Sequence, residues 1–163
     1  MKELERLYKE IHPKIYAFFY VKTSSREVAE DLTQDVFYEA MKGLSSFKGK
    51  STLQTWIFSI ARNLLFKYYR SNKYQRHLKQ QLKKEEGKET NSPEHVTLIQ
   101  EEARELIKKI KALNDLQREI VILRIYAELS FKEIGELIQK SENYARVTFH
   151  RMKLKLQKEM EGK

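Results

Sequence analysis

Apolar residues spaced three and four apart dominate the middle of this sequence, and they predict a long amphipathic helix. Between Ser51 and Tyr69 these positions are Leu53, Trp56, Ile57, Ile60, Ala61, Leu64 and Leu65. This spacing places them on one face of an α-helix. Ser51 lies three residues before Gln54, which is the capping-box arrangement of a helix start. The element expected here is therefore a helix with one buried face.

The rest of the chain has few residues that would interrupt helices. It contains two prolines and five glycines in 163 residues, and runs of alternating β-branched residues are missing. Pro13 is expected to break or restart the first helix. We predict an all-α fold of two small helical domains, residues 1–80 and 96–163. The polar segment 81–95 is predicted to be a flexible linker between them.

Composition favours an anionic partner and excludes several kinds of chemistry. The net charge is +9, which suits nucleic acid or a membrane surface. No apolar run approaches the roughly 20 residues that span a bilayer, and the amphipathic N-terminus is unlike a signal peptide, so we expect a soluble, cytoplasmic protein. The absence of cysteine excludes disulfides, cysteine nucleophiles and thiolate metal sites.

The central helix leads into a strongly basic stretch. Its polar face carries Arg62, Asn63, Lys67 and Arg70, and the range 62–84 holds eight Lys or Arg residues and no Asp or Glu. Tyrosines, including Tyr68, are interleaved with these cations. Cations bind phosphates and flat rings stack on unpaired bases, so the pattern favours a single-strand-binding surface. A merely solvated basic face is the alternative.

An acidic face is expected on the helix that ends near Gly43. Its members are Glu30, Asp31, Gln34, Asp35 and Glu39. The four histidines of the chain are scattered without ligand spacing, so we predict no metal site, no cofactor and no catalytic site. The face is either simply solvated or, on a basic protein, a docking surface for another protein through charge complementarity.

The C-terminal part predicts a helix-turn-helix. A short helix at 131–138 follows a capping box of Ser130 and Glu133, the small Gly135 would let a second helix cross closely, and Ser141 would cap that helix. The exposed positions expected on the second helix are Asn143, Tyr144, Arg146, Thr148, Arg151 and Lys153. Such a surface suits the major groove of DNA. A plain helical hairpin is the alternative.

Four motifs in order resemble a known family. They are A-E-D-L-T-Q-D-V-F at 29–37, F-K-G-K-S-T-L-Q-T-W-I-F-S-I-A-R-N at 47–63, L-N-D-L-Q-R-E-I-V-I-L-R at 113–124, and L-S-F-K-E-I-G-E-L-I-Q-K-S-E-N-Y-A-R-V-T-F-H-R at 129–151. The chain resembles, over nearly its whole length, the sigma-70 family of bacterial RNA polymerase sigma factors, of the small extracytoplasmic-function (ECF) type. The resemblance implies an alternative sigma factor that recognises promoters and promotes transcription initiation without covalent chemistry.

The resemblance also implies roles for individual residues. The residues implied to dock on core RNA polymerase are Asp31, Gln34 and Asp35. Those implied to open and hold the minus-ten element are Phe47, Lys48, Lys50, Ser51, Trp56, Arg62, Asn63, Lys67, Tyr68 and Arg70. Those implied to read the minus-thirty-five element are Ser141, Asn143, Tyr144, Arg146, Thr148, Arg151 and Lys153.

The chain departs from the family pattern in the helix-turn-helix. Gln139 stands where a glycine is common, and Lys140 where an apolar residue is common. Small sigma factors lack further domains, which implies dependence on both promoter elements and control by an anti-sigma factor, often membrane-anchored. Two other functions remain open: a conventional helix-turn-helix regulator whose residues 1–80 sense a ligand or dimerise, and a basic membrane-surface protein.

Overall fold

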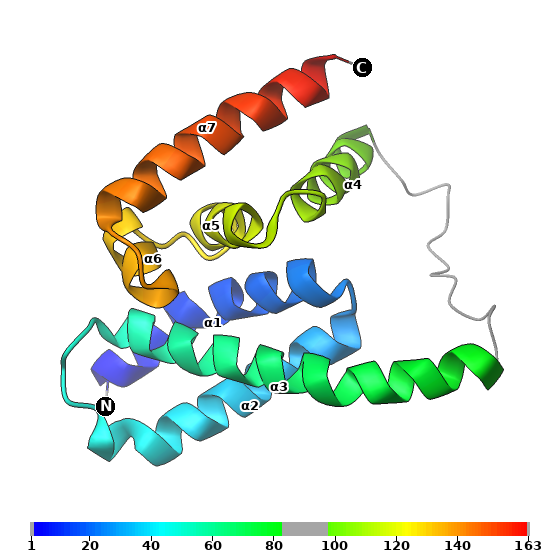
Figure 1. Cartoon of the computed structure of the whole chain (residues 1–163). Helices are drawn as coiled ribbons and strands as arrows, with labels where there is room; N and C mark the ends of the chain where they lie inside the picture. The colour runs from blue at the N-terminus through cyan, green and yellow to red at the C-terminus, as the bar shows by residue number, and fades with distance from the viewer. Residues whose placement is uncertain (1, 83–97, 163) are drawn as a thin grey trace.

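The chain is helical, as its sequence predicts. The computed structural model describes residues 2–82 and 98–162, and within these ranges it contains no strand. The elements are α1 (Lys2–Thr23), α2 (Arg26–Gly43), a short 3-10 turn η1 (Leu44–Ser46), α3 (Leu53–Leu82), α4 (Leu98–Lys111), α5 (Asp115–Ile125), α6 (Phe131–Ile138) and α7 (Glu142–Glu161). Figure 1 shows α1–α3 as a lower group and α4–α7 as an upper group. The first two residues of the predicted linker 81–95 belong to α3, and the rest of it lies outside the described residues.

Helices α1–α3, the first module, enclose one apolar core. Phe18 and Phe58 are fully buried, and their rings meet edge to face at 5.8 Å. The expected break at Pro13 is wrong, because α1 continues through this residue. Pro13 is exposed, while Ile11 and Ile15 on either side are buried in the core. Proline cannot donate one backbone hydrogen bond of the helix. Packing of the turns on both sides therefore keeps the helix continuous although this bond is missing.

Helices α4–α7 form the second module, in which α4, α6 and α7 pack against α5. Five consecutive residues of α5 are buried, from Glu119 to Leu123. Over this stretch the helix is therefore covered on every side, while its ends at Asp115 and Ile125 are exposed. Other helices of the second module cover part of α5, and α1 lies against it from below (Figure 1). The two modules are therefore stacked on one another.

Hydrogen bonds between polar side chains link the two modules at the start of α3. Glu133 of α6 accepts hydrogen bonds from the Thr52 hydroxyl at 2.9 Å and from the Gln54 amide at 3.3 Å. The same carboxylate accepts the backbone N–H of Ser130 at 2.9 Å, which completes the predicted capping box of α6. Burial alone would raise the pKa of Glu133, but these hydrogen bonds outweigh it, so the pKa lies below its ordinary value.

Candidate nucleic-acid interface

The loop before α3 carries two lysines beside a packed aromatic pair. The rings of Phe47 and Trp56 lie 5.0 Å apart, and both side chains are half-buried. Lys48 and Lys50 are exposed on either side of Gly49. Gly49 has φ +72°, a left-handed conformation that glycine adopts without strain. The loop therefore presents cations from a backbone turn that the neighbouring ring pair anchors.

The start of α3 differs by one residue from the expected capping box of Ser51 and Gln54. Thr52, not Ser51, is the N-cap, because its hydroxyl accepts the backbone N–H of Thr55 at 3.0 Å. The Ser51 hydroxyl donates to the carbonyl of Thr52 at 3.1 Å. Gln54 donates to Glu133 instead of turning back to the helix start. A partner 79 positions away in the sequence therefore engages the side chain that the predicted capping box would have used.

Beyond the loop, α3 presents a continuous exposed face. Its members, here called the α3 outer face, are Asn63, Phe66, Lys67 and Arg70. Phe66 is 63% exposed, and the guanidinium of Arg70 lies 5.2 Å from the centre of its ring. An exposed ring among cations suits stacking on an unpaired base.

The sequence pattern indicated Tyr68 as the ring that stacks on a base, and it did not indicate Phe66. Tyr68 is half-buried against the core, because it follows the buried Leu65 by three residues and shares its face. Phe66 follows Asn63 by three residues and precedes Arg70 by four. Its spacing from these polar residues is the signal that would have identified it.

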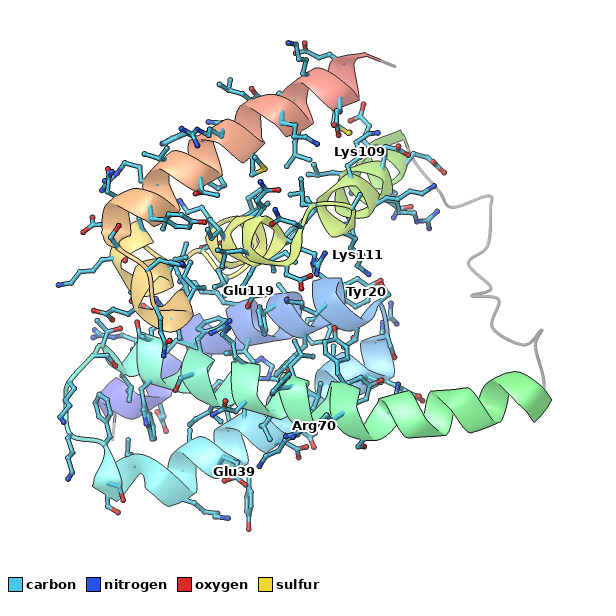
Figure 2. All side chains as sticks on the ribbon, viewed as in Figure 1. Tyr20, Glu39, Arg70, Lys109, Lys111 and Glu119 are labelled. Atoms are coloured by element: carbon cyan, nitrogen blue, oxygen red, sulfur yellow. The ribbon has the colours of Figure 1, made fainter. Side chains whose placement is uncertain are left out.

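Arg62 is turned toward the second module. Its Nε atom donates to a carboxylate oxygen of Glu119 at 2.8 Å, and Nη1 donates to the carbonyl of Leu137 at 2.7 Å. Lys22 of α1 binds the other carboxylate oxygen of Glu119. Figure 2 shows Glu119 on the side of α5 that faces the first module. Arg62, a member of the predicted minus-ten set, thus donates hydrogen bonds to two helices of the second module, α5 and α6.

Glu119 is charged in this setting. Its burial alone would raise the pKa of the carboxyl, but the charges and hydrogen bonds of Lys22 and Arg62 outweigh burial and hold the pKa below its ordinary value. A buried carboxylate with two cationic partners is a stable arrangement, whereas the same carboxylate without them would be costly. The pairing therefore links α5 to α1 and α3.

A hollow of about 340 Å³ adjoins this cluster. The residues that line it are Lys22, Arg62, Asn63, Leu65, Phe66, Tyr69 and Glu119. The Tyr69 hydroxyl donates to the carbonyl of Lys22 at 3.0 Å, which ties α3 to α1 at the edge of the hollow. Cations, an amide and two rings thus converge at one place, and these are the groups that bind nucleotides in a single strand.

The predicted helix-turn-helix is confirmed in α6 and α7. Gln139, between the helices, has φ 62° and ψ 46°, the left-handed conformation that commonly ends a helix. The backbone N–H of Lys140 donates to the carbonyl of Gly135 at 2.9 Å. A Cβ atom on Gly135 would lie 2.7 Å from the carbonyl oxygen of Lys140. A glycine is therefore needed at position 135 because the backbone of the turn, at Lys140, approaches it closely.

The second helix of this motif presents most of the predicted groove-reading residues to solvent. Ser141 caps α7 by accepting the backbone N–H of Tyr144 at 2.9 Å. The exposed members are Ser141, Asn143, Tyr144, Arg151 and Lys153, and the half-buried ones are Arg146 and Thr148. Arg146 donates to Glu142 at 2.8 Å and lies 5.5 Å from the ring of Phe131. These two contacts hold its guanidinium in place.

The acidic face of α2 is on the opposite side of the first module from α5. Asp31, Gln34 and Asp35 are all exposed, while Leu32 and Val36 between them are buried. Figure 2 shows Glu39 on the outer edge of the same helix. The three predicted docking residues therefore form one accessible surface that the stacked second module leaves uncovered.

The described residues hold neither a metal-binding cluster nor a membrane-spanning helix. In residues 2–82 and 98–162, no group of three or more His, Asp or Glu side chains is placed to hold a metal ion. Within the same part of the chain, no helix is both long enough and apolar enough to cross a bilayer.

Comparison with known proteins assigns both modules. The family model described as Sigma-70 region 2 matches residues 7–75, and the model described as Sigma-70, region 4 matches residues 103–156. The chain is 33% identical over 161 residues to RNA polymerase sigma factor YlaC of Bacillus subtilis, covering 96% of this chain and 91% of the relative. It is 26% identical to ECF RNA polymerase sigma factor SigX of the same organism, covering 95% and 82%.

Solved structures share the fold of the whole chain. The sigma factor RpoE from Bartonella quintana, solved in complex with the anti-sigma factor NepR, has a TM-score of 0.71 at 22% identity and covers 97% of this chain and 96% of its own. CnrH, solved with the cytosolic domain of CnrY, has a TM-score of 0.65 at 16% identity, covering 99% and 87%. With both family models, relatives along nearly its full length and this shared fold, the chain belongs to the sigma-70 family of RNA polymerase sigma factors, of the extracytoplasmic-function type.

Proposed function

We propose that this sigma factor uses three separate surfaces in transcription initiation. Asp31, Gln34 and Asp35 on α2 dock on core RNA polymerase. The loop 47–51 and α3 open the minus-ten element and hold its separated strand. Helix α7 reads the minus-thirty-five element as a duplex. The observation that carries this proposal is the α3 outer face, where an exposed phenylalanine lies among cations on a member of this family.

Strand holding is a binding mechanism in which no covalent bond changes. Opening the duplex costs stacking and pairing energy. Each captured base that stacks on a protein ring returns roughly 1–3 kcal/mol, and the phosphates are neutralised by lysine and arginine. One ring, Phe66, and the cations Lys48, Lys50, Lys67 and Arg70 offset only part of that cost. Core polymerase therefore has to supply the remainder, which explains why the docking face on α2 is part of the mechanism.

The helix-turn-helix reads sequence by a different chemistry. Arginine donates two hydrogen bonds to a guanine edge, and lysine contacts phosphate. Before DNA binds, Arg146 donates to Glu142 and lies near the Phe131 ring, and the exposed contact with Glu142 is weak enough to be exchanged for a base edge. Arg151 and Lys153 are exposed and free to reach the backbone or a base edge.

An anti-sigma factor is the proposed regulator. The sigma factor RpoE, which shares this fold, has been solved with the anti-sigma factor NepR, and CnrH, which also shares it, with the cytosolic domain of CnrY. We propose that the chain acts in the cytoplasm, with core polymerase, promoter DNA and an anti-sigma factor as its partners.

Transcription in vitro tests the function directly. Core RNA polymerase, with and without the protein, is given a fragmented library of host genomic DNA. New start sites that share two upstream motifs are expected. No new starts from folded protein and active polymerase would contradict the proposal and favour a conventional regulator.

The docking face has its own test. Asp35→Lys is expected to weaken binding to core polymerase at least about tenfold, because it reverses a charge on the acidic surface. Glu10→Lys is the matched control, since it makes the same charge change at an exposed position of α1. Affinity is measured by fluorescence anisotropy with labelled sigma factor. Equal effects of the two substitutions would place the docking face elsewhere.

A further inference from the structure

The two cations that bind Glu119 belong to one preformed site on the first module. Lys22 comes from α1 and Arg62 from α3, and both helices pack on the same core. The bond from the Tyr69 hydroxyl to the Lys22 carbonyl ties the helices together at this point. The side chains of Lys22 and Arg62 are 14% and 32% exposed. We call this pair the Lys22–Arg62 site.

The occupant of this site is a carboxylate of the second module. Glu119 presents one oxygen to each cation, and its side chain is 11% exposed. A phosphodiester likewise presents two anionic oxygens, and arginine binds carboxylates and phosphates with the same geometry. The Lys22–Arg62 site therefore has the charge and the donors that a phosphate needs.

The position of the site relative to α3 favours a nucleic-acid phosphate. The hollow beside the two cations is also lined by Asn63 and Phe66, two members of the α3 outer face. A strand whose base stacks on Phe66 would place a neighbouring phosphate close to the cations. In the stacked arrangement this approach is blocked, because Glu119 fills the site and the Leu137 carbonyl accepts a further N–H of Arg62.

We propose that the Lys22–Arg62 site binds a backbone phosphate of the minus-ten strand, and that Glu119 occupies it as an internal competitor when the modules are stacked. The inference rests on the proposed function, and it adds Lys22 to the strand-binding residues. Strand binding and stacking then exclude one another. By linkage, DNA that binds the site separates the modules, and any change that separates the modules raises the affinity for DNA.

Glu119 has a matched control at the same interface. Glu128 also crosses to the first module, but it reaches Lys14 only at 4.0 Å and its side chain is 67% exposed. Exposed pairs of this kind contribute little. Glu119→Gln and Glu128→Gln change the net charge equally. A difference in DNA affinity between the two variants is therefore due to the buried position of Glu119 and not to a general attraction of DNA to a more positive protein.

The experiment measures separation of the modules and DNA affinity on the full chain. The protein has no cysteine, so Glu10→Cys and Lys158→Cys place a pair of dyes on exposed positions of α1 and α7. The probe is a labelled single-stranded DNA of mixed sequence, about twelve nucleotides long, titrated without polymerase. Circular dichroism verifies that each variant is folded.

In the wild type, DNA is expected to increase the distance between the dyes. Glu119→Gln should show the longer distance without DNA and bind the probe roughly tenfold more tightly, because less of the protein is held in the stacked state. Glu128→Gln should change the affinity less than about twofold. In the Glu119→Gln background, Lys22→Gln should remove most of the gain, whereas Lys9→Gln, at an exposed position of the same helix, should not.

Different failures have different meanings. Equal affinities for the two glutamine variants, or DNA binding with an unchanged dye distance, would overturn the competitor while leaving the sigma function intact. Retention of the full gain in the double variant with Lys22→Gln would overturn the phosphate site. Absence of transcription with core polymerase would instead contradict the proposed function itself, and that assay is run on the same protein preparations.

Discussion

At the scale of single residues, α3 carries two phenylalanines with different roles: Phe66 is proposed to bind DNA, and Phe58 belongs to the core. Phe66 is 63% exposed, whereas Phe58 is fully buried. Phe66→Ala is expected to leave the free energy of unfolding within about 0.5 kcal/mol of the wild type, as for other surface changes. Its affinity for single-stranded DNA should fall by roughly 1–3 kcal/mol, the contribution of one stacked base.

The control for this prediction is Phe58→Ala. It should cost about 3–5 kcal/mol of stability, because it leaves a cavity in the core of the first module. Both variants are compared by urea unfolding, and DNA affinity is measured by anisotropy on the folded fraction. Unchanged DNA affinity for Phe66→Ala would return this ring to the class of exposed residues without a function.

At the scale of elements, the turn between α6 and α7 carries a residue that its backbone conformation does not favour. Gln139 has φ 62°. The left-handed conformation costs an ordinary L-residue roughly 1–2 kcal/mol, and glycine avoids this cost while losing about 0.5–1 kcal/mol of chain entropy. Gln139→Gly should therefore stabilise the second module by about 0.5–1 kcal/mol, measured by urea unfolding.

Gln157→Gly is the matched substitution within α7. Gln157 is exposed in the interior of that helix, where glycine costs roughly 0.5–1 kcal/mol. The same chemical change should thus have opposite signs at the two positions. A loss of stability at both would mean that the Gln139 side chain makes a contact in solution that offsets its backbone cost.

The elements were predictable where the deciding contacts are local. The all-α fold, the short helix 131–138 and the cap of Ser141 follow from periodicity and from hydroxyls next to apolar runs. The cap of α3 was predicted one residue early, because Thr52 and Ser51 are both good caps and Glu133 of the distant α6 favours the arrangement with Thr52. The break at Pro13 was also wrong, since tertiary packing overrides the local preference.

Side-chain environment was harder to predict than helix position. The basic, aromatic character of α3 was visible in the sequence, but the selection of Tyr68 over Phe66 required knowing which side of the helix the core occupies. The partner of Arg62 could not be found from sequence. Glu119 lies 57 positions away in a segment whose period reads as an ordinary core helix, and only the stacking of two modules brings them together.

For the whole molecule, the stacking of the modules depends on a buried carboxylate, Glu119, that acid can neutralise. Lys22 from α1 and Arg62 from α3 hold the pKa of Glu119 below its ordinary value despite burial. Lys111 also lies at this junction, where its amine donates to the Ser24 hydroxyl at 2.5 Å. Burial, then the charges of Arg118 and Lys22, lower the pKa of Lys111.

The sign of the pH dependence follows from this direction. A carboxyl whose pKa is lower in the stacked form stabilises that form fully above its ordinary pKa of about 4.3, and the stabilisation is lost as the pH falls through the depressed value. Small-angle scattering of the wild type from about pH 7 to about pH 3 should therefore show an increase in the radius of gyration in that acid window, with helicity followed by circular dichroism. Glu119→Gln should already be expanded at neutral pH, so protonation of Glu133 at the same interface should add little further expansion in this window. A wild type that stays compact until its helices melt, or a variant that expands over the same window, would show that the stacked arrangement depends on other contacts than the buried glutamate.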